Sequence, residues 1–400
     1  MSTSTEAADR VLTVNTGSSS LKVAVFATRP AEARIVAEEV ERTADPAAAL
    51  RAVLERLRQG DHDQSLAAVA HRVVHGGQRY QDPQLITADV LGELRTMVSI
   101  DPDHMPQALA AIQVITEAHP TVPQVACFDT AFHRSLPCVA QMYALPRRFR
   151  DAGVRRYGFH GLSCEYIVGE LAKADRAAAA GRVIIAHLGS GASLTAVRDG
   201  RSVETTMGFS PTGGLIMGTR SGDLDPGVLL YALQREHMSA DAISLLINRE
   251  AGLAGVSETS ADMRDLLARE ATDSRASDAI ALFCYAIRKS IGALMAALGG
   301  LDTLIFTAGI GEHAAPVRER VCAGLSCFGI ELDAARNAAH APIISRDGSA
   351  VVIRVMKTDE DMMLARHARL ILSPPGSPSG SPPQRGCRVG DAGAGEDTHV

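Results

Sequence analysis

The stretch N-T-G-S-S-S-L-K at residues 15–22 offers groups that suit phosphate chemistry. Gly17 permits close backbone approach to a ligand, the serines supply O–H and N–H donors, and Lys22 adds a positive charge. It is not the G-x-x-x-x-G-K-[ST] phosphate loop, because a strand pattern rather than a helix pattern follows it. Taken alone, the stretch fits a plain hairpin turn better than a phosphate site.

A second stretch, H-L-G-S-G-A-S at residues 187–193, has the same character. Superposing Gly17 on Gly189 brings Ser18 onto Ser190, with apolar strand patterns on both sides of each loop. Two related loops in one chain favour a polyphosphate ligand that both loops embrace. A third glycine cluster, T-A-G-I-G-E-H at residues 307–313, is expected to be a loop that suits the close approach of a nucleoside.

Two arginines next to glycine-rich segments are candidate anion-binding residues. Arg72 lies in H-R-V-V-H-G-G at residues 71–77, and Arg220 lies in M-G-T-R-S-G-D at residues 217–223. A guanidinium group can hold a carboxylate or a phosphate through two parallel hydrogen bonds. The alternative for each arginine is a structural salt bridge.

An aspartate and a histidine complete the set of candidate chemical groups. Asp129 follows the predicted strand Gln124–Phe128, at a strand end where α/β sheets tend to carry function. Its alternative role is a helix N-cap. His160 lies in the aromatic, glycine-bounded turn R-R-Y-G-F-H-G, where a histidine with a satisfied core role is the alternative.

Strand and helix patterns alternate around these residues, which indicates the α/β class. The strand–loop–strand pattern that surrounds Gly17 returns around Gly189, which predicts two related lobes rather than an array of short repeats. The other predicted elements are a strand at Asp302–Phe306 and helices at Met105–Ala118, Ala276–Leu298, Ala314–Leu325 and Asp361–Leu372.

The composition limits the classes of partner and compartment. A net charge of −6 and a pI near 6.1 argue against binding nucleic acid or an anionic membrane. Seven cysteines without C-x-x-C spacing, a polar start and no apolar run of ~18 residues predict a cytoplasmic protein without a disulfide framework, zinc site, signal peptide or membrane span. Residues 373–400, rich in Pro, Gly and Ser, are expected to form a disordered tail.

Nine segments in order resemble the acetate kinase (acetokinase) family, short-chain carboxylate kinases of the sugar kinase/Hsp70/actin superfamily. They span about Val11 to Leu372 and read VNTGSSSLK, HRVVHGG, FDTAFH, RRYGFHG, HLGSGAS, MGFSPTGGLIMGTRSGD, DMR, FTAGIGE and TDED. The resemblance implies a two-lobed, duplicated ribonuclease H-like (actin-like) α/β fold with an interlobe cleft. The lobes would be residues 1–130 plus 361–372, and residues 131–360. It also implies a homodimer that transfers a phosphoryl group reversibly from ATP to acetate with Mg²⁺, or Mn²⁺ in its place, giving acetyl phosphate and ADP.

The same resemblance assigns roles residue by residue. Asp129, His160 and Arg220 resemble catalytic residues, Asn15 and Glu360 resemble the magnesium-site residues, and Arg72 resembles the arginine that binds the acceptor carboxylate. The apolar acceptor-pocket positions are Val74, Phe159 and Pro211. The nucleotide-binding positions are Lys22, His187, Leu188, Gly189, Ser190, Gly191, Asp262, Met263, Arg264, Gly309, Ile310, Gly311, Glu312 and His313.

The acceptor segment departs from the family pattern. Where the family has approximately A-P-L-H-N-P, this chain has D-P-D-H-M-P, with Asp103 at the leucine position and Met105 at the asparagine position. A carboxylate at residue 103 would repel an anionic acceptor unless it is paired or turned away. Acetate is therefore the expected acceptor, with propionate, butyrate or another short carboxylate as the alternative. A second alternative is a nucleotide-binding regulatory protein without catalysis. Arg72→Ala is expected to reduce turnover far more than fold stability.

Overall fold

The computed structural model of this chain describes residues 9–17, 20–28, 33–41 and 45–373. Contacts divide these residues into two units. The first unit contains the described residues up to 132 together with 159–166 and 359–373, and the second contains 133–158 and 167–358. Ser18 and Ser19 of the first glycine-serine stretch lie outside the described residues, as does the expected tail beyond Ser373.

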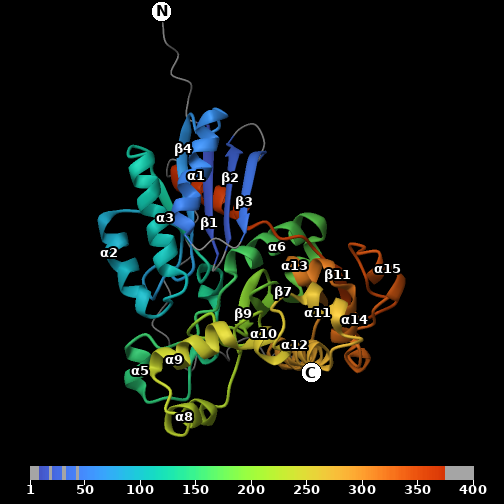
Figure 1. Cartoon of the computed structure of the whole chain (residues 1–400). Coiled ribbons are helices and arrows are strands. Elements are labelled where there is room, and N and C mark those ends of the chain that lie inside the picture. The colour runs from blue at the N-terminus through green and yellow to red at the C-terminus, as the bar shows by residue number, and fades with distance from the viewer. Residues whose placement is uncertain (1–8, 18–19, 29–32, 42–44, 374–400) are drawn as a thin grey trace, which may run out of the picture. The chain divides into compact units, whose positions relative to one another are not determined.

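A six-stranded sheet with the order β3-β2-β1-β4-β6-β5 forms the centre of the first unit (Figure 1). β1, β2 and β3 are antiparallel neighbours, whereas β1, β4 and β6 run parallel and β5 runs antiparallel to β6. The carboxyl ends of β1, β4 and β6 therefore lie at one edge of the sheet. The strands are β1 (Arg10–Thr16), β2 (Ser20–Ala27), β3 (Arg34–Glu41), β4 (Leu66–Val73), β5 (Gln84–Leu85) and β6 (Gln124–Phe128).

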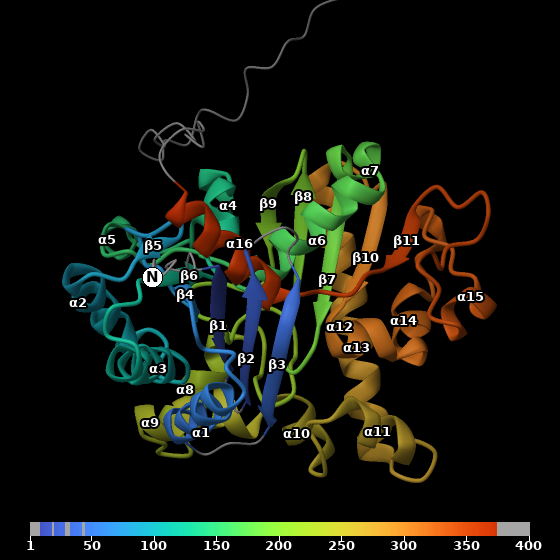
Figure 2. The ribbon, with the colours of Figure 1, turned by 90° about the horizontal axis from the view of Figure 1, so that it is seen from above.

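Helices cover both faces of this sheet. α1 (Pro46–Gln59) and α3 (Met105–Ala118) pack together on one face, and α16 (Glu360–Leu372) packs across β1 and β4 on the other (Figure 2). The α1 sequence dictates this placement, because the Asp45 side chain accepts the N–H of Ala48 at its start and its leucines recur at helical spacing on the buried side. α2 (Ala88–Thr96) and a 3-10 turn (Met97–Ser99) precede α3.

The second unit contains a five-stranded sheet with the order β11-β10-β7-β8-β9. β7, β8 and β9 are antiparallel neighbours, and β7, β10 and β11 run parallel. This repeats the arrangement of β6-β4-β1-β2-β3, so the predicted duplication and the α/β class are confirmed. The strands are β7 (Arg182–Leu188), β8 (Ala192–Arg198), β9 (Arg201–Thr205), β10 (Thr303–Thr307) and β11 (Val352–Val355).

The longest helix of the second unit, α12 (Ser274–Leu298), packs against β7, β8 and β9. α6 (Gly161–Ala174) begins in the first unit and continues into the second. The remaining helices are α4 (Cys138–Gln141), α5 (Arg147–Asp151), α7 (Arg176–Ala180), α8 (Pro226–Gln234), α9 (Ala240–Leu245), α10 (Gly252–Ser257), α11 (Met263–Arg269), α13 (Ala308–His313), α14 (Ala315–Cys322) and α15 (Ala334–Ala338). Short 3-10 turns span Ala131–Ser135 and Ser326–Phe328, and a π-helical turn spans Leu246–Glu250.

One sequence expectation needs correction. The third glycine cluster is not a loop, because residues Ala308–His313 form the short helix α13. Among the described residues, α12 is long and apolar enough to cross a membrane by length and composition, although 44% of its most apolar window is buried and a core helix passes the same test. Cys138 is disulfide-bonded, and a single bonded cysteine is not the disulfide framework that the sequence argued against.

Candidate functional sites in the two units

A buried ion pair between Arg72 and Asp129 stands at the carboxyl edge of the first sheet. β4 ends at Val73 and the parallel neighbour β6 ends one residue before Asp129, whose N–H donates to the carbonyl of Val73 over 3.1 Å. Arg72 Nε and Nη2 both donate to Oδ2 of Asp129, at 3.0 and 2.6 Å. The salt bridge that the sequence left open as an alternative role for Arg72 is thus formed.

Asn15 and Glu360 join this pair from β1 and from the start of α16. The Nδ2 of Asn15 donates to Oε2 of Glu360 over 3.0 Å, and Nη1 of Arg72 donates to Oδ1 of Asn15 over 3.3 Å. The Nε of Arg72 lies 3.9 Å from Oε2 of Glu360. The structure therefore brings together four of the sequence-predicted residues. After the role predicted for Arg72, we call Asn15, Arg72, Asp129 and Glu360 the acceptor-side cluster.

Burial and charge perturb both members of the central pair. Burial alone would lower the pKa of Arg72, but Asp129 and Glu360 raise it above its ordinary value. Burial raises the pKa of Asp129 and Glu360 adds to that rise, while Arg72 opposes it. The guanidinium is therefore permanently charged, and the site holds one cation between two carboxylates.

The acceptor-side cluster fits the ligand preference of magnesium. Mg²⁺ prefers oxygen ligands, keeps several waters and takes few protein groups. Asn15 and Glu360 supply an amide oxygen and a carboxylate, and the second carboxylate oxygen of Asp129 is buried without a hydrogen-bond partner among the described residues. No group of three or more His, Cys, Asp or Glu residues in the described ranges forms a metal-binding set, so any metal here would depend on water and substrate oxygens.

His160 occupies a strained turn that is tied to Asp129. Its φ of 58° lies in the left-handed region, which is costly for a residue with a side chain and is frequent at functional sites. The next residue, Gly161, donates its N–H to the carbonyl of Asp129 over 2.9 Å, and a Cβ there would collide with that carbonyl oxygen. Phe159 is buried against the ring of His75, and the pocket position Val74 is buried close by in sequence.

The sequence assigned no role to a buried Asp–His pair in the first unit. Asp101 is almost fully buried and its Oδ1 lies 2.8 Å from Nδ1 of His104. Burial would raise the pKa of Asp101, but His104 and then His75 hold it below its ordinary value. The sequence signal that could have predicted this pair is the aspartate three residues before the histidine in D-P-D-H. Met105, by contrast, is a core residue of the cluster around Val73, Leu94 and Phe128.

Lys22 lies on β2 and pairs with Glu39 of β3 over 3.1 Å, with both side chains about half exposed. Burial would lower the pKa of Lys22, but the hydrogen bond and charge of Glu39 raise it. The structure thus gives Lys22 a partner in its own sheet, although the lysine stays accessible.

The second unit brings its glycine-rich segments together. The loop between β7 and β8 is a tight hairpin in which Gly189 N–H donates to the carbonyl of Gly191 over 2.9 Å. Gly218 donates to the carbonyl of Ser190 over 3.0 Å, and Ala261 lies against Gly218. α13 packs against β7 and β10. The predicted segments at 187–191, 217–223, 262–264 and 309–313 are therefore neighbours within one unit.

Arg220 is held by its own loop. Its Nη1 donates to the carbonyl of Pro211, which is buried, over 2.6 Å. The start of α10 supports the same loop, because the N–H of Leu253 donates to the carbonyl of Met217 and a Cβ on Gly252 would collide with that carbonyl oxygen. The predicted catalytic residue Arg220 and the predicted acceptor-pocket residue Pro211 are thus in direct contact.

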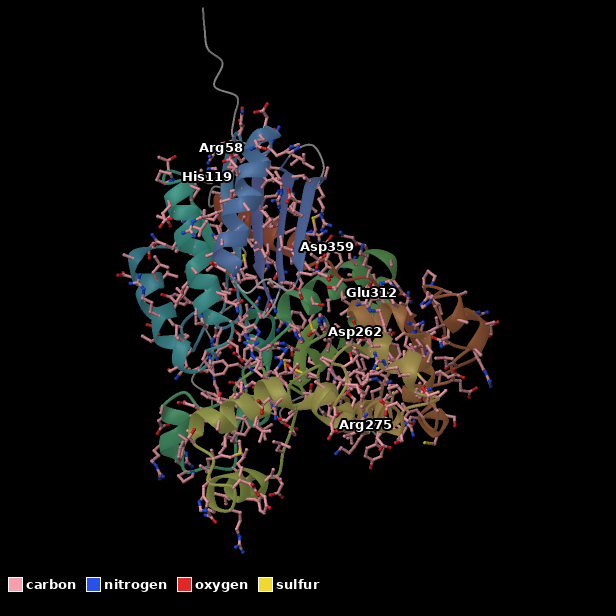
Figure 3. The ribbon with its side chains drawn as sticks, viewed as in Figure 1. Arg58, His119, Asp262, Arg275, Glu312 and Asp359 are labelled. Carbon is pink, nitrogen blue, oxygen red and sulfur yellow. The ribbon has the colours of Figure 1, made fainter. Side chains whose placement is uncertain are left out.

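The residues predicted to bind the nucleoside, of which Figure 3 labels Asp262 and Glu312, differ in accessibility. Asp262 caps α11 by accepting the N–H of Arg264, and it also pairs with the Arg264 guanidinium, whose side chain is 89% exposed. Met263 is buried and so belongs to the core. His313 is exposed, whereas the Glu312 side chain is mostly buried and accepts the N–H of Ala308 over 3.0 Å.

Comparison with known proteins gives concordant matches. The model of the acetokinase family matches residues 31–366. An acetate kinase of Methylocella silvestris is 50% identical over 327 residues, which cover 82% of this chain and 80% of that relative. The crystal structure of Porphyromonas gingivalis acetate kinase has a TM-score of 0.82 and 34% identity, covering 91% of this chain and 100% of the other. A propionate kinase structure from Francisella tularensis also has a TM-score of 0.82, with 33% identity and coverage of 90% and 98%.

Proposed function

This chain belongs to the acetokinase family, and we propose that it is an acetate kinase that transfers the γ-phosphoryl group of ATP reversibly to acetate. The observation that carries this proposal is the acceptor-side cluster, in which a buried arginine is held between Asp129 and Glu360 beside Asn15. The products are acetyl phosphate and ADP.

The chemistry of the acceptor explains why no strong base is needed. A carboxylate is already ionised at neutral pH, so one of its oxygens attacks the γ-phosphorus while the bond to the ADP oxygen breaks, and no proton is transferred. Catalysis then depends on in-line placement and on charge neutralisation at the phosphoryl oxygens. We assign the binding of the acceptor carboxylate to Arg72, its orientation to Asp129, and charge stabilisation to His160 and Arg220.

Magnesium, or manganese in its place, would be held by Asn15 and Glu360 and would neutralise phosphate charge. The nucleotide would be bound by the second unit, through His187–Gly191, Asp262–Arg264 and Gly309–His313. The convergence of these segments within that unit supports the assignment. Ser190 and Arg264 are exposed and would contact the ligand directly, whereas buried Met263 would act through packing.

The acceptor is tested with a series of carboxylates. Purified enzyme with Mg-ATP and formate, acetate, propionate or butyrate would be assayed by trapping the acyl phosphate as a hydroxamate. We expect the highest kcat/KM for acetate. Asp103 in the acceptor segment and the likeness to a propionate kinase support propionate as the second candidate, and equal or better turnover of propionate would make that candidate the better one.

The same assay separates an enzyme from a regulatory protein. If the protein bound ATP but made no acyl phosphate from any carboxylate, the nucleotide-binding regulatory alternative would replace the proposed function. ATP binding would be measured by isothermal titration calorimetry on the same preparation. We expect both binding and turnover, because the described residues keep the complete set of charged groups at the acceptor-side cluster.

We further propose a cytoplasmic homodimer without nucleic-acid or membrane partners, with two lobes at 1–130 plus 361–372 and at 131–360. The family resemblance supports the dimer, and α8 provides apolar surface for it, since Val228, Leu230, Tyr231 and Leu233 are exposed. Light scattering coupled to gel filtration should give twice the chain mass of 42.2 kDa. A monomer at micromolar concentration would contradict this.

A further inference from the structure

Arg318 of α14 is fully buried, and all three nitrogens of its guanidinium group donate hydrogen bonds. Nη1 donates to the carbonyls of Gly311 and Glu312 over 2.8 and 2.9 Å. Nε donates to Oδ1 of Asn337 over 2.8 Å, and Nη2 donates to the carbonyl of Asn337 over 2.9 Å. Nη2 also lies 3.1 Å from Nδ1 of His340, which itself lies 3.0 Å from the carbonyl of Glu312 and accepts from Arg318 only in the tautomer that leaves Nδ1 without a proton. Every nitrogen of the guanidinium group therefore has an acceptor.

None of these groups carries a negative charge. Within the described residues, no carboxylate lies within 4.0 Å of the Arg318 guanidinium, although buried arginines are normally paired with one. Burial lowers the pKa of Arg318 to about 10, which leaves the group charged at neutral pH. The second unit thus keeps a positive charge in its interior that only neutral dipoles solvate.

The guanidinium supports the last turn of α13. A helix of this length leaves its carbonyls unsatisfied and is unstable by itself. Arg318 satisfies those of Gly311 and Glu312, and a cation is also favourable at a helix carboxyl end. At the other end of α13, the Glu312 side chain accepts the N–H groups of Ala308 and Thr358.

The conformation that is held in this way is a strained one. Ala308 has a φ of 63°, which lies in the left-handed region that a residue with a Cβ rarely adopts. Such a residue persists only where its surroundings fix it. Arg318 from one end and the Glu312 carboxylate from the other fix the six residues of α13, and Asn337 extends the network by donating to the carbonyl of Ala315 over 2.9 Å.

We propose that Arg318 is a positioning residue for the nucleotide: it holds the Gly309–His313 segment in its binding conformation from the interior, and its charge, which no protein carboxylate neutralises, favours an anionic ligand on that segment. This inference rests on the proposed nucleotide role of Gly309–His313. Arg318 has no direct contact with the ligand in this role and takes no part in acceptor binding.

The experiment compares Arg318→Met, Arg318→Lys and the matched control Arg320→Met. Arg320 lies two residues away on α14 and forms an ion pair with Glu270 nearer the surface. The dissociation constant of Mg-ADP would be measured by calorimetry without acetate, and the KM values of ATP and acetate by kinetics. Circular dichroism and thermal denaturation would establish that each variant is folded. The wild-type protein is titrated first, since its failure to bind ADP would refute the proposed function itself.

We expect Arg318→Met to weaken ADP binding by roughly tenfold or more, because a small displacement of a binding segment removes much of its contact geometry. Arg318→Lys keeps the positive charge but loses the planar guanidinium group and its several donors, so its affinity for ADP should lie between those of the wild type and Arg318→Met. The KM of acetate should change less than about twofold in both variants, and Arg320→Met should match the wild type.

Two results would overturn the inference. One is a folded Arg318→Met protein whose ADP affinity stays within twofold of a wild type that binds ADP. The other is an equal loss of affinity in Arg320→Met, which would show a general effect of substitutions in α14. If Arg318→Met does not fold, Arg318→Lys decides the question, and wild-type affinity in that variant would likewise overturn the inference.

Discussion

The buried His367 of α16 should make the first unit less stable as the pH rises above neutrality. Its Nε2 lies 3.1 Å from Oε2 of Glu165 at the start of α6, and Cys127 of β6 faces the same ring. Burial alone would lower the pKa of His367, but Cys127 and Glu165 raise it from 6.5 to about 10. Burial raises the pKa of the Cys127 thiol, so that group stays neutral.

The pKa of His367 sets the size of the effect. A rise from 6.5 to about 10 corresponds to roughly 5 kcal/mol. Because the Glu165 side chain is 36% exposed, solvent screening reduces this to about 2–3 kcal/mol. The folded state binds the proton more tightly than the unfolded state, so this stabilisation is complete below pH 6.5 and is lost as the pH rises to about 10.

His367→Gln tests this reasoning, since glutamine can hydrogen-bond Glu165 but has no charge. The melting temperature of the variant should lie roughly 4–10 °C below that of the wild type at pH 6.5. The two values should converge by pH 10. His119→Gln is the matched control: His119 ends α3 (Figure 3), and burial lowers its pKa, so its effect should not change between pH 6.5 and 10. A difference between wild type and His367→Gln that is constant over this range would refute the reasoning.

Arg72→Ala should lower kcat/KM for acetate by roughly 100-fold. It should also lower the free energy of unfolding by about 3 kcal/mol, because Asp129 is left buried and unpaired; adding Asp129→Asn should restore the melting temperature but not turnover. Asp103→Leu should raise kcat/KM for acetate by about threefold, and an unchanged value would place that carboxylate away from the acceptor. Asp101→Asn, which weakens the bond to His104, should cost about 1–2 kcal/mol in thermal denaturation, and an unchanged melting temperature would show that the pair does not stabilise the fold.

Elements with strong periodicity were predicted well from the sequence. The helix Met105–Ala118 and the strand Gln124–Phe128 match the structure to the residue. Apolar spacing over 14 residues identifies the helix, whereas short length and the residues on either side identify the five-residue strand. α13 was predicted wrongly as a loop, since two glycines in six residues disfavour a helix. The hydrogen bonds from Arg318 to the carbonyls of Gly311 and Glu312 stabilise the helix in spite of these glycines. The sequence of residues 308–313 alone gives no sign of these bonds.

The contacts within the acceptor-side cluster could not be predicted from local sequence patterns. Asn15 and Glu360 are hydrogen-bonded although 345 positions separate them, and only the path of α16 back to the first sheet brings them together. For Arg72, the sequence offered a ligand-binding role or a salt bridge, and the pair with Asp129 shows that the salt bridge forms without consuming all of its donors. The expectation that Arg72→Ala reduces turnover far more than fold stability therefore needs revision, because the substitution also leaves Asp129 buried without its partner. The roles themselves came from the family resemblance.

The path of α16 has a consequence for protein synthesis. The strands β1 to β6 leave the ribosome early, but the helix that covers one face of their sheet and carries Glu360 is made only after the whole second unit. Until then the nascent sheet has an uncovered apolar face around Val11, Phe26 and Val125. A chain that stops before residue 360 would therefore release a first unit with an exposed apolar sheet face and with an acceptor-side cluster that lacks Glu360. We expect such a product of premature termination to be degraded by proteases rather than to persist as a weak kinase.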